Sequence, residues 1–192
     1  MNELKNSYKN VKEIFQYYWS IYGGWKALSV SPYLHLAILL LALTHHYWSE
    51  RGWWQQSLSI LPNLLGFSLG GFAIFLGLGD EQFRAILAQK DKNEKNSPYT
   101  LVSSTFVHFI LVQCLGIIFA LLSKSMAYQP SWLSDEYMAY FRYITPICWG
   151  IGYLFLLYAI TSMMAVVMAI FRCTKLYEIY QQKLEEENSD DN

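Results

Sequence analysis

Residues 58–78 of this chain read LSILPNLLGFSLGGFAIFLGL. This stretch holds no charged residue, and its 21 residues are enough for an α-helix to cross a hydrocarbon core of about 30 Å. Because an unpaired peptide group costs several kcal/mol in hydrocarbon, a spanning segment of this kind must be helical. The stretch therefore predicts a transmembrane helix.

Three other stretches have the same character. Residues 33–48, 101–122 and 144–171 are apolar and carry no charge in their interiors. Only 15% of the 192 residues are charged and 54% are hydrophobic, whereas a soluble domain carries about 25% charge. We therefore predict an all-α fold with a bundle of four transmembrane helices over residues 29–172. An N-terminal amphipathic helix and a cytoplasmic C-terminal helix extension should flank the bundle.

The distribution of Lys and Arg predicts the orientation. Eleven of the 14 lie before the first stretch, between the second and third, or after the fourth. Segments rich in Lys and Arg stay in the cytoplasm, and an even number of crossings puts both ends on that side. The expected location is a bacterial inner membrane, with the lipid bilayer as one partner. A net charge of −1 gives no general attraction to nucleic acid.

Aromatic residues gather where the chain should emerge on the outer side. Tyr47, Trp48, Trp53 and Trp54 surround the first outer turn, and residues 125–143 hold six more aromatic residues. Trp and Tyr favour the headgroup level of a membrane. We expect an aromatic belt at the outer surface. An outward-facing binding surface is the alternative for residues 125–143.

Residues 1–28 carry an apolar stripe at helical spacing. Its members recur every three or four residues and are Leu4, Tyr8, Val11, Phe15, Tyr18, Tyr22 and Trp25. Lys5, Lys9 and Lys12 lie off the stripe, and Gly23–Gly24 should weaken the end of the helix. Two interpretations stay open: the helix lies in the cytoplasmic interface of the membrane, or it packs against the cytoplasmic ends of the protein's own helices.

Two more segments on the cytoplasmic side show helical pattern. Residues 173–192 should extend the fourth span, with Leu176, Tyr180 and Leu184 on one side and a solvated acidic end. The loop of residues 80–96 begins with a short amphipathic stretch and continues as a polar linker.

One face of residues 58–78 is made of small residues. At spacings of four and three, this small-residue face comprises Ser59, Asn63, Gly66, Gly70, Ala73 and Gly77. Small residues let another helix approach closely, and Gly66 with Gly70 forms the small-xxx-small pattern. Two uses fit the face: a helix-packing or oligomer interface, or the lining of a narrow path.

Polar side chains stand inside the later spans. His108 and Gln113 lie in the third, and Thr161 and Ser162 lie in the fourth. At membrane depth such groups usually face the interior of a bundle and form hydrogen bonds there. His108 is able to titrate near neutral pH. A neutral structural histidine is the plainer interpretation.

No constellation for catalysis or metal binding is visible in the sequence. His46 and Glu50 stand four residues apart, beside His45, but a metal site needs three or four well-placed ligands. No HExxH, GxSxG, phosphate-loop or CxxC motif occurs. We predict a protein that is not an enzyme and takes no metal and no cofactor.

The four stretches, the cytoplasmic ends and the string LPNLLGFSLGGFAIFLGLGDEQF at residues 61–83 resemble the KwaA family, the membrane subunits of Kiwa anti-phage systems. The resemblance covers the whole chain at the level of architecture. It implies an oligomer in the inner membrane that works with a soluble, DNA-binding partner, while the chain itself contacts no nucleic acid. It transfers no site residue.

The leading hypothesis is a non-enzymatic, oligomeric inner-membrane subunit that senses at the membrane or anchors there, and that recruits a cytoplasmic partner in anti-phage defence. The amount of patterned cytoplasmic sequence motivates this hypothesis. A pore-forming or membrane-depolarising effector is the alternative.

Overall fold

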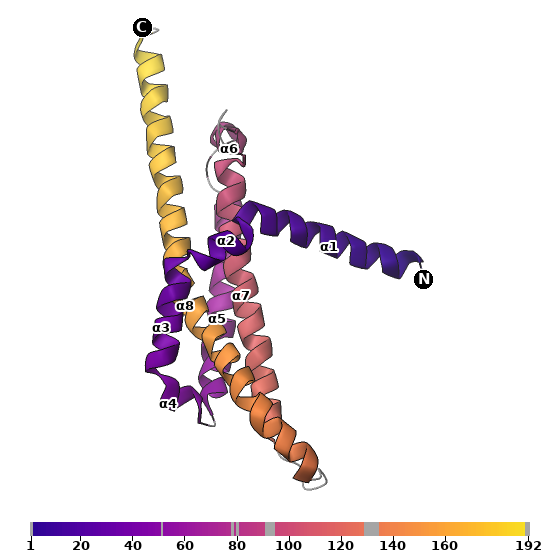
Figure 1. The fold of residues 1–192 in the computed structure, drawn as a ribbon. Helices are drawn as coiled ribbons and strands as arrows, with labels where there is room; N and C mark the ends of the chain where they lie inside the picture. Colours follow the sequence, from indigo (N-terminus) through magenta and orange to yellow (C-terminus); the bar gives the residue numbers. More distant parts are fainter. Residues whose placement is uncertain are drawn as a thin grey trace. The chain divides into compact units, whose positions relative to one another are not determined.

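The computed structural model describes residues 2–50, 52–77, 79, 81–90, 95–128 and 135–190, with side chains for all of these except residues 2, 135–142 and 183–190. Every regular element in these ranges is an α-helix, which confirms the predicted all-α class. In chain order the helices are α1 (Asn2–Tyr22), α2 (Gly24–Ser29), α3 (Pro32–Leu43), α4 (His45–Trp48), α5 (Trp53–Leu76), α6 (Glu81–Ala88), α7 (Pro98–Met126) and α8 (Asp135–Asp190) (Figure 1).

Three of these helices are long and apolar enough to cross a membrane, namely α5, α7 and the part Tyr143–Gln182 of α8. The prediction of a membrane protein is confirmed to this extent. The helices are longer than the apolar stretches that predicted them, because backbone hydrogen bonding continues into the polar flanks. α5 begins at Trp53 rather than at residue 58, and α7 ends at Met126 rather than at residue 122.

The remaining predicted span, residues 33–48, is divided in the structure. α3 has 12 residues, or about 18 Å at 1.5 Å per residue, whereas the hydrocarbon core is about 30 Å thick. Ser31 caps its start. At its end the Thr44 hydroxyl donates to the Leu40 carbonyl at 2.7 Å, and Thr44 separates α3 from α4. A count of four spans is thus not shown by these helices.

Contacts divide the chain into two compact units. Unit 1 comprises Met1–Val30, Phe72–His108 and Ala165–Asn192, and unit 2 comprises Ser31–Gly71 and Phe109–Met164. α5, α7 and α8 are each divided between the two units. Unit 1 gathers α1, α2, α6 and the C-terminal part of α8, which are the segments that the charge pattern predicts to be cytoplasmic.

The core of unit 2 is rich in tryptophan and tyrosine. Trp53 is buried with its ring centroid 5.6 Å from that of Tyr153, and Trp54 is buried 5.3 Å from the ring of Trp149. The rings of these two tryptophans lie between α5 and α8, so side chains of the same chain cover them. Whether they stand at the level of the membrane surface, as the belt predicts, stays a prediction.

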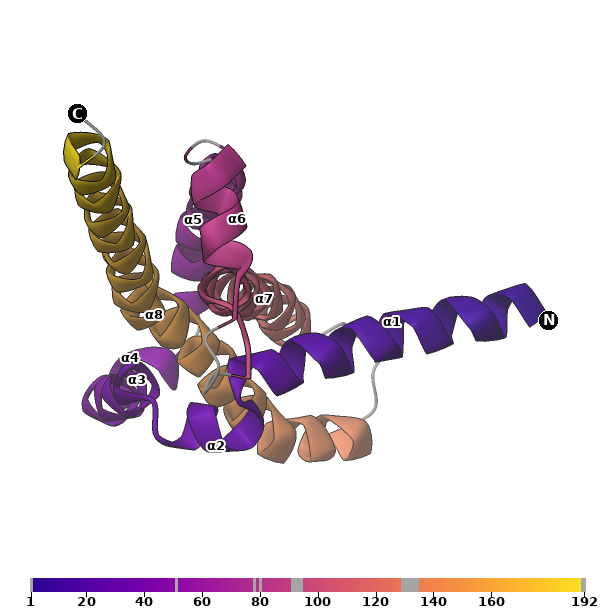
Figure 2. The ribbon, with the colours of Figure 1, turned by 90° about the horizontal axis from the view of Figure 1, so that it is seen from above.

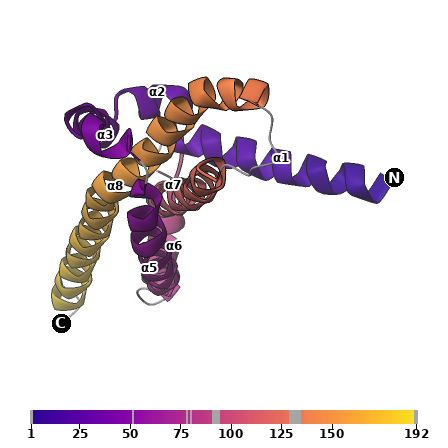
Figure 3. The same ribbon diagram turned by 90° about the horizontal axis from the view of Figure 1, so that it is seen from below.

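α3 also packs in unit 2. The Thr161 hydroxyl of α8 donates to the backbone carbonyl of Tyr33 at 2.9 Å, so α3 is held against α8 near its first turn. Figure 3 shows these two helices side by side. Thr161 thereby satisfies its hydroxyl inside an apolar helix, which a polar group at that depth requires.

The core of unit 1 joins α6 to the C-terminal part of α8. Phe83, Leu87 and Tyr180 form a buried cluster, and Tyr99 packs against it. The Tyr180 hydroxyl donates to Gln82 Oε1 at 3.1 Å. The amphipathic stretch of the loop forms the helix α6, and α8 continues through the C-terminal segment to Asp190. The structure adds that they pack on each other.

Some predictions fall on residues that the structure describes only in part. In the outer segment 125–143, residues 129–134 lie outside the described ranges, and from Asp135 onward the chain belongs to α8. The belt and the binding surface for this segment both stay predictions. Residues 91–94 of the loop and the acidic side chains from residue 183 onward also lie outside the described part.

Candidate assembly face

Helix α5 has one buried side and one open side. Leu61, Ser68 and Phe75 are buried and follow one another at seven-residue spacing, so they share a side. The members of the small-residue face are all exposed; they are Ser59, Asn63, Gly66, Gly70, Ala73 and Gly77. At 3.6 residues per turn, the middle of that face stands about 170° from the buried side. The two sides of α5 therefore have opposite environments.

Gly66 and Gly70 show how open this face is. A methyl group added at either position would meet no heavy atom within 4 Å among the described residues, apart from the adjacent backbone of the same helix. At Gly77 the nearest atoms are carbonyl oxygens of the same helix, 3.7 Å away at Ile74 and 3.8 Å away at Ala73. The described helices of the chain thus leave the face uncovered. Its use as an interface between chains stays a prediction.

Asn63 is the most polar member of the face, and it is satisfied locally. Its amide Nδ2 donates to the Ser59 carbonyl at 2.8 Å, one turn earlier in the same helix. The Asn63 side chain therefore needs no second helix for this hydrogen bond.

A polar contact with α7 lies on the buried side of α5, in unit 2. Gln113 is fully buried, and its Nε2 donates to Ser68 Oγ at 3.0 Å. Ser68 in turn donates to the Leu64 carbonyl at 2.6 Å. Figure 2 shows α5 beside α7. The Ser68–Gln113 pair links the two helices through a hydrogen bond that apolar surroundings keep from water.

His108 of α7 lies in unit 1 and contacts α1. Its Nδ1 is 2.7 Å from the Tyr18 hydroxyl, and its ring stacks on that of Tyr22 at a centroid distance of 3.9 Å. Burial raises the pKa of Tyr18 above its ordinary value, and the neighbouring Tyr22 raises this pKa further. The phenol therefore stays protonated and is available to donate to Nδ1. This contact ties the end of α1 to α7.

His108 and Gln113 thus pair with Tyr18 and Ser68, neither of which was predicted from the sequence as a candidate site residue. The apolar stripe contains Tyr18, but nothing in the stripe indicates a hydrogen bond to a residue 90 positions away. For Ser68 a signal was present. This serine follows Gly66 by two residues, which places it off the small-residue face, and a hydroxyl inside a span needs a partner.

The described contacts offer packing surfaces and hydrogen bonds. Within the described ranges, no three His, Cys, Asp or Glu side chains lie close enough together to hold a metal ion. Cys114, Cys148 and Cys173 are free thiols.

No model of a known protein family matches this chain, and no curated protein or solved structure matches it either. Its function must therefore be inferred from its own residues.

Proposed function

We propose that this chain is a non-enzymatic subunit of a bacterial inner membrane that assembles with copies of itself through α5 and recruits a soluble cytoplasmic protein. The observation that carries the proposal is the open small-residue face. Lipid tails are as apolar as leucine, so helices in a membrane associate through close packing rather than through burial from water. A face of small residues that no described helix of its own chain covers suits that kind of contact.

The extent of the face supports assembly. It runs from Ser59 to Gly77, which is about 27 Å of helix and most of a bilayer's hydrocarbon thickness. Gly116 of α7 and Gly152 of α8, both in unit 2, are already in close contact with side chains of the same chain. Gly66 and Gly70 are free to take part in contacts with another chain.

The topology belongs to the same proposal. Both ends lie in the cytoplasm, and α3 with α4 completes a fourth crossing beside α5, α7 and α8. The concentration of Lys and Arg around the ends and the middle loop supports this orientation.

The soluble partner binds the packed helices α6 and α8 of unit 1. Their cluster of Phe83, Leu87 and Tyr180 gives them a rigid base, and the apolar side chains of Ile86 and Ile179 remain exposed on the same two helices. We place the contact with the partner at these exposed apolar side chains. The role in anti-phage defence rests on the resemblance to Kiwa membrane subunits.

The assembly is tested by the double substitution Gly66→Leu with Gly70→Leu. Two leucines would hold a second helix away from the α5 backbone, so we expect a particle of lower mass in gentle detergent, measured by native mass spectrometry. The matched control is Leu69→Phe with Leu76→Phe, which enlarges two exposed residues of α5 outside the small-residue face. A wild-type chain that is monomeric, or a double mutant of unchanged mass, would contradict the proposal.

The soluble partner is tested by purifying the chain from its native cells in gentle detergent. A cytoplasmic protein in fixed ratio to the chain is expected, and its loss on Ile86→Glu would place it on α6. Recovery of the chain without any such protein would contradict this part of the proposal.

A pore is the second candidate function, because the same open face carries the polar side chains of Ser59 and Asn63. Copies that meet around an axis along this face would place both side chains on a path. This candidate predicts a loss of membrane potential on overexpression that Asn63→Leu changes, detected with a potential-sensitive dye. A potential that stays constant at high expression would exclude it.

A further inference from the structure

Helix α1 uses one stripe for two different surroundings. At its C-terminal end the stripe residues Tyr18 and Tyr22 contact His108 of α7. Further toward the N-terminus the same stripe is open to solvent, with exposed fractions of 64% at Leu4, 71% at Tyr8 and 57% at Val11. Figure 1 shows these N-terminal turns extending away from α7. The open part of the stripe needs an apolar partner.

We infer that the N-terminal turns of α1 lie on the surface of an anionic phospholipid bilayer. The stripe points toward α7 where the two helices meet, and α7 is long and apolar enough to cross a membrane. In the turns of α1 on the N-terminal side of that contact, the same side of the helix faces whatever surrounds α7. In a membrane α7 is surrounded by lipid, so Leu4, Tyr8 and Val11 face the boundary between headgroups and acyl chains.

The position of the contact on α7 fits the depth of such a helix. The apolar part of α7 begins at Leu101, and His108 follows seven residues later. Seven residues of helix span about 10 Å. Amphipathic helices of this kind bury their apolar side about 5–10 Å into the boundary between headgroups and acyl chains. The contact with His108 therefore holds α1 at the level where an interfacial helix lies.

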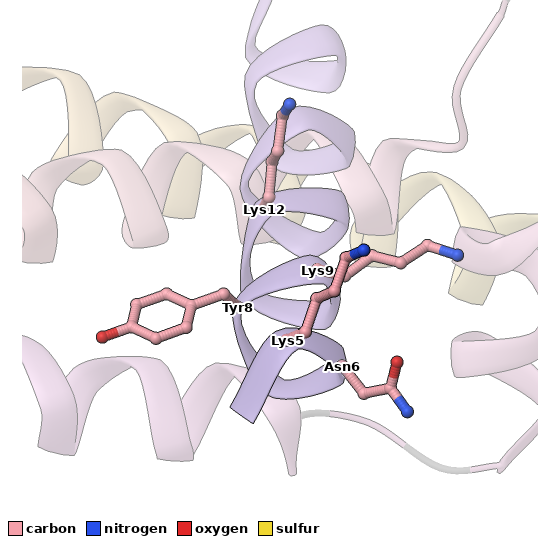
Figure 4. Close-up of a pocket in the computed structure, with 5 residues that line it drawn as sticks. All are labelled: Lys5, Asn6, Tyr8, Lys9 and Lys12. Carbon is pink, nitrogen blue, oxygen red and sulfur yellow. The ribbon is translucent and has the colours of Figure 1, made fainter. Parts of the chain in front are cut away.

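The charged groups beside the stripe suit anionic headgroups. Lys5, Lys9 and Lys12 line one shallow hollow on α1 together with Asn6 and Tyr8 (Figure 4). The lining has three ammonium groups and no carboxylate, which suits the negative charge of lipid phosphates. The exposed pair of Lys9 with Glu13, at 3.9 Å, competes only weakly because solvent screens it.

This inference uses the cytoplasmic orientation of the proposed function, but it needs neither the assembly through α5 nor a soluble partner. A failure of either proposal is therefore visible separately. The particle mass reports on the assembly, whereas a probe on α1 reports on the lipid contact.

The test places an environment-sensitive fluorophore on the stripe of the full-length chain. Cys114, Cys148 and Cys173 are first replaced by Ser, and Val11→Cys carries the dye. The chain is reconstituted in vesicles of neutral phosphatidylcholine and in vesicles with one quarter phosphatidylglycerol. We expect blue-shifted emission and quenching by lipid-bound nitroxide in the anionic vesicles. A dye at Asn10→Cys, off the stripe, should remain in a watery environment.

Removal of the three lysines tests the electrostatic part. With Lys5, Lys9 and Lys12 replaced by Gln, the ratio of lipid-bound to free α1 in anionic vesicles should fall by about a hundredfold at low ionic strength, since each lysine near such a surface contributes about fivefold. The matched control replaces Arg84, Lys90 and Lys95 by Gln, which removes the same charge away from α1, and should leave the emission unchanged.

Two results would overturn the inference. One is a dye at position 11 that remains in water in both kinds of vesicle. The other is a dye that enters the lipid equally in neutral and anionic vesicles. If the dye enters anionic vesicles while the particle is monomeric, the inference stands and the assembly through α5 fails.

Discussion

Two pairs of glycines in unit 2 have opposite surroundings. Gly116 and Gly152 are in tight packing, because an added Cβ would come within 2.7 Å of Leu61 Cδ1 and within 2.6 Å of the Trp53 ring, respectively. At Gly66 and Gly70 an added Cβ would meet no described atom within 4 Å beyond the adjacent backbone. The same residue type thus serves contacts inside the chain in one group and leaves a surface open in the other.

A small residue in a span therefore has a function only with respect to a neighbour. Gly152 lets the Trp53 ring approach α8, so its missing side chain is already used. At Gly66 and Gly70 no described residue of another helix fills the space beside the α5 backbone. Substitutions at the two groups should therefore separate folding from assembly.

The largest effect on folding is expected for Gly152→Ala. The new methyl would lie 2.6 Å from the Trp53 ring and 3.2 Å from Phe119 Cβ, and Trp53 is 1% exposed, so its ring has no free space to move into. Overpacking of this kind costs about 1–3 kcal/mol, and the preference of a helix for alanine over glycine offsets up to about 1 kcal/mol of it. Gly116→Ala should cost less, because Leu61 Cδ1 is the end of a flexible side chain. Denaturant unfolding in detergent measures both, and equal stability of Gly152→Ala and wild type would contradict the packing in unit 2.

A smaller effect is expected from the polar groups on the two sides of α5. Ser68→Ala removes the acceptor of the fully buried Gln113 amide, and hydrogen bonds between membrane helices contribute about 0.6 kcal/mol on average and up to about 1.7 kcal/mol. Ser59→Ala removes the same hydroxyl from the open side and should leave the unfolding free energy unchanged. The same experiment compares the two. An equal loss of unfolding free energy in Ser68→Ala and Ser59→Ala would contradict the division of α5 into a buried side and an open side.

The smallest effect is expected for Gly66→Ala with Gly70→Ala. Nothing among the described residues of other helices stands near either position, and alanine favours a helix by up to about 1 kcal/mol per residue over glycine. The unfolding free energy should stay constant or rise slightly, and the particle mass should persist because alanine is still small. A marked loss of stability would mean that a helix of the same chain covers this face.

The sequence was sufficient to predict features that depend on local pattern. The charge-free residues 58–78 predicted α5, and the spacing of apolar residues predicted α1, which ends at Tyr22 just before Gly23 and Gly24. Gly23 has a φ of 99°, a backbone conformation that a residue with a side chain rarely adopts, so the glycine pair does end the helix there.

Features that depend on pairing between distant segments were not predictable in the same way. The hydrogen bond of Ser68 with Gln113 joins residues 45 positions apart, and no local pattern specifies it. Trp53 is of a residue type that is typical of a membrane belt, and only the fold shows that its ring is buried in a core. The small-residue face was visible in the sequence, but which neighbour it faces depends on the arrangement of the other helices.

The short length of α3 has a consequence for the lipid around it. A helix of 12 residues leaves about 12 Å of a normal hydrocarbon core unmatched on any path that it follows through a bilayer. Such hydrophobic mismatch is relieved when nearby acyl chains thin the membrane or when other protein segments take the place of lipid. The crossing that we propose for α3 and α4 therefore predicts a preference for short-chain lipids around α3.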